Sequence, residues 1–411
     1  MTRRKLMSEV GSEGFAYAGI CLSCMTDPFL RQAYSNRPPA TCSVCGQVGQ
    51  PTVTADHLAR ISRDVISQNF TIYPDLYPGY HGLSLSEVVG RVLGCADPAF
   101  CDLVVSHLVN PSGQESSGEE YFSEGQEYQE HRLEFDSPED EREYVVAQWK
   151  LVALNLTHRQ RFFNSDAQNF FAALFEEATN ARENTLFDGQ KSPTVVQPRA
   201  GLRIFRARRV DNPKERETIL AAPAKELGAP PKEGAAHNRM NSTGVPLFYA
   251  ATDAATCIAE VRPSIGDEVI VGQFATTKEL RLFDFRGLDR PRSHSKISYF
   301  LSDYTARMRS RQLLAHLHHL ISEPVRPNGH GYVVTQAMAE FLRYKCPEPF
   351  DGIIFRSVQA GGANYVIFND PAAAHELQAP DWQPVFPVKH VGGPRAHMVT
   401  GIEYKHKAIE D

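Results

Sequence analysis

One stretch organises the second half of this chain: His237-Asn-Arg-Met-Asn-Ser-Thr-Gly-Val-Pro-Leu-Phe-Tyr-Ala-Ala-Thr-Asp-Ala-Ala-Thr-Cys-Ile-Ala-Glu260. Arg239 is followed ten residues later by Tyr249, which ends an apolar run typical of a strand. Thr252-Asp253 can cap a helix through Ala254–Glu260. The Gly-containing turn between Arg239 and Tyr249 folds the arginine back against the strand. We therefore expect a cation, an aromatic face and a carboxylate at one cleft.

The segments around this stretch predict a strand-rich domain. Short runs rich in β-branched and aromatic residues predict strands at Leu202–Arg208, Leu247–Tyr249, Glu268–Phe274, Arg281–Phe285, Gly352–Phe355 and Asn364–Phe368. Helices are expected at Ala254–Glu260, at Ile297–Ile321, and from a cap at Thr335 through Met338 to Tyr344. The chain after Asp370 is Pro-rich and irregular, with a possible edge strand at Gly401–Ala408. The predicted fold class is α+β, with this mixed domain spanning 195–411.

A hydroxyl follows one of the later predicted strands. Gly352-Ile-Ile-Phe-Arg-Ser357 ends in a serine, and the loop Gln359–Ala363 then leads to Asn364. Taken singly, such residues have ordinary explanations: an arginine or glutamate at the surface, a tyrosine in the core, a serine closing a turn. Residue chemistry alone leaves a nucleotide pocket as one alternative among these.

The order of these segments resembles the RES domain, named for its arginine, glutamate and serine and found in toxins of bacterial toxin–antitoxin systems. The family's arginine turn, tyrosine strand and glutamate helix fall on Arg239, Tyr249 and Glu260. Its serine falls on Ser357, and an arginine on its first strand falls on Arg206. The resemblance implies an ADP-ribosyltransferase-like fold and an enzyme that consumes NAD⁺.

The resemblance also implies roles for these residues. Cleavage of the nicotinamide–ribose bond needs a carboxylate beside an oxocarbenium-like ribose, which we assign to Glu260. Guanidinium groups suit the pyrophosphate, which we assign to Arg239 and Arg206. Tyr249 would stack on the nicotinamide or ribose, Ser357 would bind the nicotinamide amide or orient Glu260, and Asn364 would line the same site. The acceptor stays open: water or phosphate gives NAD⁺ depletion and growth arrest, and a protein side chain gives ADP-ribosylation.

Two CxxC pairs mark the N-terminal region, 1–54. Their ligand set would be Cys21, Cys24, Cys42 and Cys45. This spacing is typical of a structural Zn²⁺ site with a closed Cys₄ shell. A redox dithiol or a chance grouping are the alternatives. The other four cysteines lie in apolar surroundings and are expected in the core.

Helical periodicity dominates 55–185, as in Tyr144–Leu156 and Gln168–Thr179. An acidic, Ser/Gly-rich interval at 113–143 predicts a solvated loop. With the cysteine pairs, this region resembles a domain fused to long RES proteins that has been likened to HEPN domains. An Arg-x4-His pair of the kind HEPN ribonucleases use occurs at Arg311 and His316, but it lies in the other half and is interpreted as coincidence.

Composition sets the remaining bounds. A chain of 411 residues with 42% hydrophobic content suggests two to three globular domains, and the formal net charge of −6 argues against wholesale nucleic-acid wrapping. We expect a cytoplasmic protein, with no export signal and no membrane span. An alternative hypothesis is a zinc-dependent nucleic-acid-binding regulator whose second half only senses a nucleotide. A partner antitoxin, or regulation in cis by the N-terminal half, is also expected, and the oligomeric state stays open.

Overall fold

A computed structural model of the chain describes residues 19–73, 82–109, 121–123, 125–130, 138–183, 192–290, 292–294, 296–322, 332–369 and 383–403. The chain divides into two compact units. Unit 1 comprises 1–141 and 296–308, and unit 2 comprises 142–295 and 309–411. Both units contain helices and strands, so the predicted α+β class is confirmed.

Unit 1 combines two small sheets with a helical core. Its strands form the orders β1-β3-β2 and β4-β6-β5. The elements are β1 (Gly19–Cys21), α2 (Pro28–Ala33), β2 (Pro39–Ala40), β3 (Gln50–Thr54), α3 (Ala55–Asn69), β4 (Phe70–Ile72), β5 (Leu83–Ser84), α4 (Leu85–Leu93), α5 (Pro98–Val109) and β6 (Glu127–Glu130). Side chains of Thr54 and Ser84 accept backbone hydrogen bonds at the starts of α3 and α4, which fixes where these helices begin.

A segment from the second half of the chain completes the core of unit 1. Tyr299 and Phe300 are buried there, and Phe300 stacks on Phe29 with ring centroids 6.4 Å apart. The Tyr299 hydroxyl donates to a carboxylate oxygen of Glu130 at 2.7 Å, and the Ser298 hydroxyl donates to Asp27 at 2.9 Å. The helix predicted over Ile297–Ile321 begins only at Tyr304. The preceding residues 298–300 form the contacts described above instead.

Unit 2 is built on one eight-stranded sheet in the order β16-β11-β9-β10-β15-β14-β12-β8. All neighbours are antiparallel except β12 and β14, which run parallel. The strands are β8 (Val195–Val196), β9 (Arg203–Val210), β10 (Phe248–Ala251), β11 (Glu268–Thr276), β12 (Leu282–Asp284), β14 (Gly352–Arg356), β15 (Ala363–Ile367) and β16 (Val388–Met398). A short pair, β7 (Arg182–Glu183) with β13 (Arg292–Ser293), lies outside this sheet. The six predicted strands all correspond to members of the large sheet.

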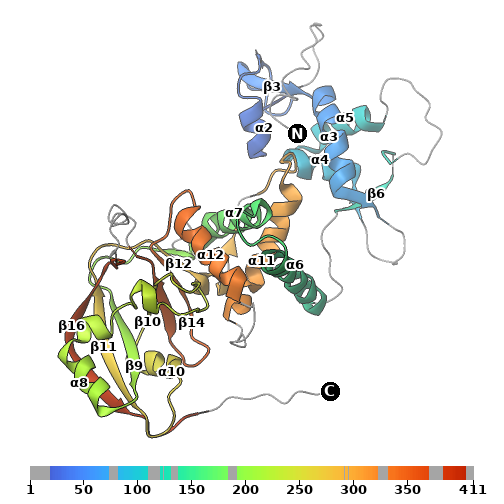
Figure 1. The fold of residues 1–411 in the computed structure, drawn as a ribbon. Coiled ribbons are helices and arrows are strands. Elements are labelled where there is room, and N and C mark those ends of the chain that lie inside the picture. The colour runs from blue at the N-terminus through green and yellow to red at the C-terminus, as the bar shows by residue number, and fades with distance from the viewer. Residues whose placement is uncertain are drawn as a thin grey trace, which may run out of the picture. The chain divides into compact units, whose positions relative to one another are not determined.

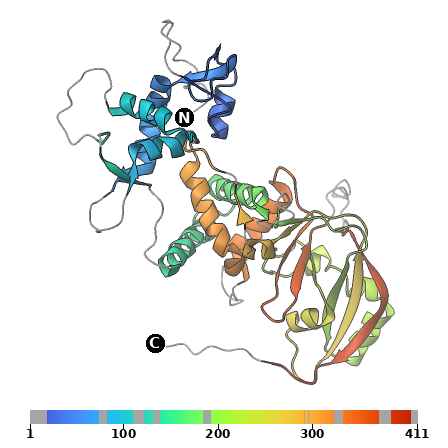
Figure 2. The same cartoon turned by 180° about the vertical axis from the view of Figure 1, so that it is seen from behind.

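Helices at one end of the sheet form the main core of unit 2. Figures 1 and 2 show this group beside β12 and β14: α6 (Pro138–His158), α7 (Ser165–Asn180), α11 (Tyr304–Ser322) and α12 (Val333–Tyr344). Phe175 of α7 packs edge-on against Phe283 at 5.0 Å and stacks with Phe341 of α12 at 5.9 Å. Residues 142–183, which the sequence grouped with the N-terminal helical region, thus belong to the compact unit that holds the large sheet.

Shorter helices lie along the rest of the sheet: α8 (Pro213–Ala221), α9 (Pro223–Glu226) and α10 (Ala254–Glu260), with 3-10 turns η1 (Lys232–Gly234) and η2 (Phe285–Asp289). Helix α10 spans the residues predicted for it and is capped by the Asp253 carboxylate, which accepts from the Thr256 N–H at 2.8 Å. Helix α12 differs from the prediction. It begins at Val333, and Thr335 lies inside it with its hydroxyl bonded to the carbonyls of Tyr332 and Arg239.

The edge strand was predicted in the wrong place. Residues 401–403 are not in a strand, and the rest of the predicted Gly401–Ala408 strand lies outside the described residues. The edge strand is β16, which pairs with β11 across a register shift between Val271 and Gln273. Its Gly-Gly-Pro sequence concealed it, because Pro394 is compatible with a strand only where its missing N–H faces away from the neighbour.

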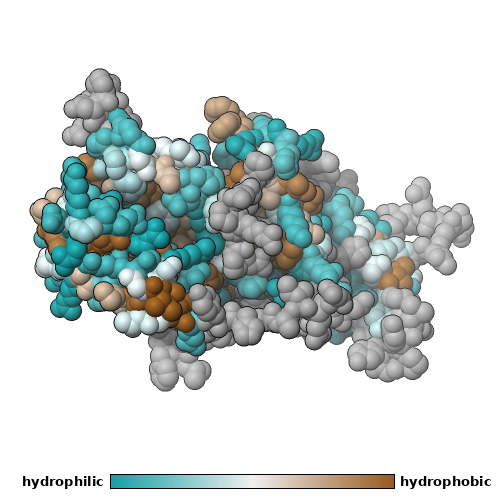
Figure 3. Space-filling model, turned by 60° about the horizontal axis from the view of Figure 1, so that its bottom comes forward, coloured by the Kyte–Doolittle hydropathy of each residue, from teal (hydrophilic) through white to brown (hydrophobic). Residues whose placement is uncertain are grey.

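The described helices include none that is long and apolar enough to cross a membrane. Hydrophilic residues predominate on the face of the molecule shown in Figure 3, and hydrophobic residues form small separate groups there.

Candidate functional site

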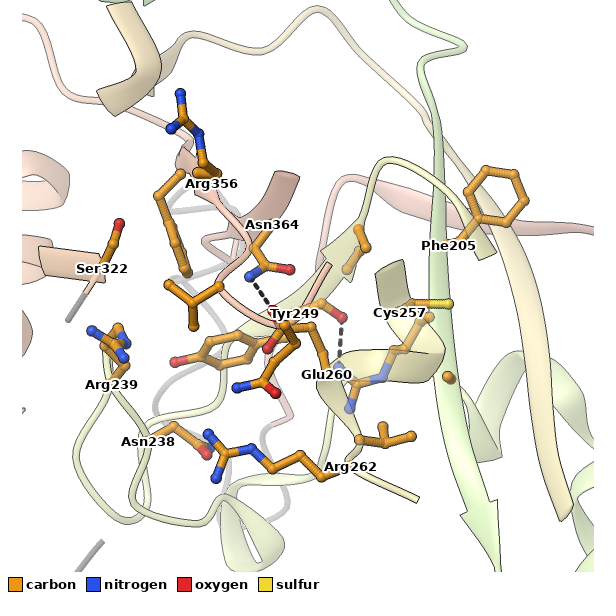
Figure 4. A pocket seen from close by; sticks show the side chains of 18 of the residues that line it. Phe205, Asn238, Arg239, Tyr249, Cys257, Glu260, Arg262, Ser322, Arg356 and Asn364 are labelled. Atoms are coloured by element: carbon orange, nitrogen blue, oxygen red, sulfur yellow. Dashed lines mark hydrogen bonds between the residues drawn. The ribbon is translucent and has the colours of Figure 1, made fainter. Parts of the chain in front are cut away.

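A cavity of about 480 Å³ opens in unit 2 among β9, β10, α10 and the ends of β14 and β15. This volume lies within the range of small-molecule sites, about 300–1,000 Å³. The predicted residues Arg206, Arg239, Tyr249, Glu260 and Asn364 all line it. Figure 4 shows Tyr249, Glu260 and Asn364 meeting at its centre, with Arg239 beside them.

The turn that carries Arg239 is held from two sides. Within the turn, Asn238 and Asn241 pair through their backbones, and Gly244 takes a left-handed conformation with φ of 84°. From outside, the Gln336 amide of α12 donates to the carbonyls of Asn238 and Asn241, each at 2.8 Å. The Arg239 side chain is thereby fixed at the rim, where it donates to the Ile321 carbonyl and lies over the Tyr332 ring at 5.6 Å.

Tyr249 joins this turn to the sheet. Its hydroxyl donates to the Asn241 side chain at 2.8 Å and accepts from the Met240 N–H at 3.2 Å. Its carbonyl accepts from the Arg206 guanidinium at 2.7 Å. Burial raises the pKa of the Tyr249 phenol, so the hydroxyl is neutral. Tyr249 also lines the cavity.

Two hydrogen bonds orient the Glu260 carboxylate. Its Oε1 atom accepts from the Ser357 hydroxyl at 2.6 Å and from the Asn364 amide at 2.8 Å. Ser357 is buried and does not line the cavity, and its oxygen also accepts from the N–H groups of Gln359 and Ala360. Since both donors reach the same oxygen, Oε2 has no such side-chain partner in the described part of the chain.

The loop after Ser357 is anchored to the helix that carries Glu260. Thr252 and Ala363 exchange backbone and side-chain hydrogen bonds, and the Asp253 cap of α10 receives the hydroxyls of Thr252 and Thr256 at 2.8 Å each. A Cβ atom on Gly362 would collide with Asp253, Thr252 and Thr256. Glycine at 362 therefore lets the loop approach the helix closely enough for Ser357 to reach Glu260.

The cavity carries an excess of positive charge. Arg206, Arg239, Arg262 and Arg356 line it against the single carboxylate of Glu260. Burial lowers the pKa of Arg206 to about 10 and lowers that of Arg239, yet the former value still leaves a cation at neutral pH. Within the described ranges, only Arg356 of these four forms an ion pair, with Asp289 at 3.1 Å. The site thus suits an anionic ligand.

Several lining residues were not found from the sequence. Arg262 is exposed and has a left-handed backbone with φ of 47°, which is uncommon for arginine and costs on the order of 1 kcal/mol. Arg356, His237 and Tyr332 also line the cavity. Strain at Arg262 follows from the chain reversal after α10, for which the local sequence carries no glycine as a signal.

The four predicted cysteine ligands converge in unit 1. Their sulfur atoms all lie within 4.8 Å of one another, and the Cys21 and Cys45 sulfurs are 3.7 Å apart. A tetrahedral site with Zn–S bonds of about 2.3 Å has edges of about 3.8 Å, so the residues fit a metal. Burial opposes ionisation of Cys42, but N–H donors from Cys45, Cys21 and Val44 outweigh it and lower the pKa of its thiol to about 6.

The other predicted residues take structural places. Cys95, Cys101, Cys257 and Cys346 are buried, as expected. Arg311 donates to the buried carboxylate of Glu177 at 2.7 Å, which ties α11 to α7.

The comparisons with known proteins concern the region that holds the cavity. Residues 203–387 match the family model of the RES domain. Among solved structures, a chain of the M. tuberculosis MbcT–MbcA toxin–antitoxin complex matches with 14% identity and a TM-score of 0.26, over 56% of this chain and 93% of that chain. No curated protein matches the sequence.

Proposed function

We propose that the RES-like region of this chain cleaves the bond between nicotinamide and ribose in NAD⁺. The observation that carries the proposal is the Glu260 carboxylate, oriented through one oxygen by Ser357 and Asn364 in a cavity with three arginines that form no ion pair in the described residues. This combination pairs one anion, suited to a developing cation, with several cations suited to a pyrophosphate.

Glu260 acts on the ribose. Breaking the C1′–N bond sends its electron pair to the pyridinium nitrogen, so nicotinamide leaves as a neutral molecule without a strong general acid. Positive charge then develops on the ribose, and the free Oε2 face of Glu260 stabilises it or accepts hydrogen bonds from the ribose hydroxyls. A water oxygen that bonds to C1′ releases its proton to the carboxylate or to solvent.

The arginines and the aromatic group hold the rest of the dinucleotide. Arg239 and Arg206 bind the pyrophosphate, and the exposed Arg262 adds a third cation to the cavity lining. Tyr249 stacks against the nicotinamide or ribose. Ser357 serves to orient Glu260 and not to touch nicotinamide, because its hydroxyl is buried and already engaged. Asn364 shares this role through the same carboxylate oxygen.

The acceptor distinguishes three outcomes. Water gives ADP-ribose, inorganic phosphate gives its 1-phosphate, and a protein side chain gives an ADP-ribosylated target. Depletion of NAD⁺ with growth arrest is the outcome we propose, in line with the toxin resemblance. The same resemblance supports a partner antitoxin. Expression of the chain alone should lower cellular NAD⁺ and arrest growth, whereas expression of its Glu260→Gln variant should do neither.

The test is nicotinamide release from NAD⁺ by the purified chain. Glu260→Gln should abolish most of it, and Glu217→Gln, an exposed position on α8 away from the cavity, is the matched control. Salt-sensitive nucleic-acid binding without nicotinamide release would instead favour the regulator.

We also propose that the Cys₄ cluster holds Zn²⁺ in a structural role. Four thiolates fill a tetrahedral shell and leave no position for a substrate. Metal content of the purified chain, near one Zn²⁺ per chain and lost in a Cys21→Ser variant, is the expected result.

Regulation by the N-terminal region requires a different test from simple truncation. Removing residues 1–179 would delete α6 and most of α7, and with them Phe171 and Phe175 from the core of unit 2. Loss of activity in that variant would then reflect unfolding. Point substitutions inside unit 1 are the appropriate probes.

A further inference from the structure

A buried histidine contacts the last residue of β14 and does not line the cavity. His318 of α11 is about 4% exposed. Its Nδ1 atom lies 2.7 Å from the Asp289 carboxylate, and its Nε2 atom lies 3.2 Å from the backbone nitrogen of Arg356. The same Asp289 oxygen also accepts from the Arg356 guanidinium at 3.1 Å. One carboxylate thus holds both the imidazole and the side chain of the residue that the imidazole contacts.

The imidazole supplies a hydrogen-bond acceptor at a position of β14 where the neighbouring strand has already ended. Successive amides of a strand point to opposite sides, and the Ser357 N–H points toward β15, where it donates to the Gly362 carbonyl at 3.0 Å. The Arg356 N–H therefore points toward β12. That strand pairs only as far as Asp284 opposite Ile354, and the chain then turns into η2. Nε2 of His318 supplies the acceptor that β12 no longer offers.

These contacts fix the protonation state of the ring. A backbone N–H can only donate, so Nε2 must carry a lone pair. Nδ1 must then carry the proton and donate it to Asp289. The Arg356 guanidinium is bound to the same Asp289 carboxylate.

Ser357 follows directly in the chain, and its hydroxyl orients Glu260. Resting on the proposed function, we infer that His318, held by Asp289, is a positioning residue that fixes the end of β14 and thereby the Ser357–Glu260 contact. Without the imidazole, the Arg356 N–H loses the acceptor that His318 supplies, and the strand end loosens. Glu260 acts mainly in the transition state, so the effect falls on kcat more than on KM.

The variants separate this role from simple packing. His318→Leu removes both hydrogen bonds, and we expect kcat for nicotinamide release to fall tenfold or more, since displacement of a reacting group by about 1 Å can cost about 100-fold. KM should change less than about threefold. His318→Gln keeps one acceptor and one donor and should recover most of the lost kcat. His316→Leu, on the same helix and outside the cavity lining, should leave both constants unchanged.

A second measurement does not depend on turnover or on a variant that folds. Nitrogen NMR of the wild-type chain with labelled histidine should show His318 in the neutral form protonated on Nδ1, and hydrogen exchange should show a protected Arg356 amide. An Nε2-protonated or doubly protonated ring, or a fast-exchanging Arg356 amide, overturns the inference even if the enzyme is active. Wild-type-like kcat in folded His318→Leu overturns it as well. Absence of nicotinamide release from the wild type overturns the proposed function, while the NMR result still decides whether His318 holds the strand end.

Discussion

Replacement of Glu260 by glutamine tests the chemistry with little change to the fold. Glutamine can keep its Oε1 where the glutamate Oε1 lies, so the donors Ser357 and Asn364 both retain an acceptor at 2.6 and 2.8 Å. What changes is the other terminal atom, which becomes a neutral NH₂ group facing the cavity. The substitution therefore removes the negative charge while the hydrogen-bond pattern behind it persists.

The size of the effect follows from that charge. Two unit charges about 4 Å apart interact by about 4 kcal/mol at an effective dielectric constant of about 20. Solvent in an open cavity weakens this, and we take a loss of about 3–4 kcal/mol of transition-state stabilisation. Each 1.36 kcal/mol is a factor of about ten, so kcat should fall about 100- to 1,000-fold.

The assay is initial-rate release of nicotinamide, with thermal unfolding measured on the same samples. Glu217→Gln should match the wild type in both. A Glu260→Gln protein with wild-type unfolding temperature and kcat within about threefold of the wild type would refute the assignment of Glu260.

The remaining predictions concern the groups around Glu260 and the cysteine cluster. Tyr249→Phe should lower stability by about 1–3 kcal/mol, because the Met240 N–H and the Asn241 amide oxygen lose their common partner; chemical denaturation measures it. Arg206→Lys should raise KM for NAD⁺ several-fold with a smaller change in kcat, since lysine cannot bind a pyrophosphate in bidentate fashion; an unchanged KM would remove Arg206 from the binding site. Stripping the metal with a chelator should unfold the region around Cys21–Cys45, seen as faster hydrogen exchange there, and re-addition of Zn²⁺ should restore protection; identical exchange with and without chelator would contradict a structural site.

Local sequence was sufficient to predict how the candidate site is assembled. The turn, strand and helix that carry Arg239, Tyr249 and Glu260 fall within 24 consecutive residues, and each has its own signal in Gly244, the apolar run and the Asp253 cap. Convergence of a hairpin-like turn and the next helix is a short-range event, so the spacing indicated it. The grouping of the two CxxC pairs was predictable for a similar reason, since each pair forms a single turn.

Contacts between distant segments could not be predicted from local sequence. Apolar periodicity predicted α7 as a helix, but it carried no information that Phe175 would pack on Phe283 and Phe341 in unit 2. Likewise, nothing beside Phe300 indicates that it completes the core of unit 1. His318 and Asp289 belong to this class: their roles depend on where β12 ends relative to β14, which is a property of strand register.

The most direct test of the central claim is a product analysis of NAD⁺ incubated with the purified chain, by mass spectrometry with and without inorganic phosphate. We expect free nicotinamide in equal amount to the NAD⁺ consumed, and about 100- to 1,000-fold slower release with Glu260→Gln. The second product identifies the acceptor. Intact NAD⁺, or cleavage at the pyrophosphate to give AMP and nicotinamide mononucleotide, would contradict the proposed function.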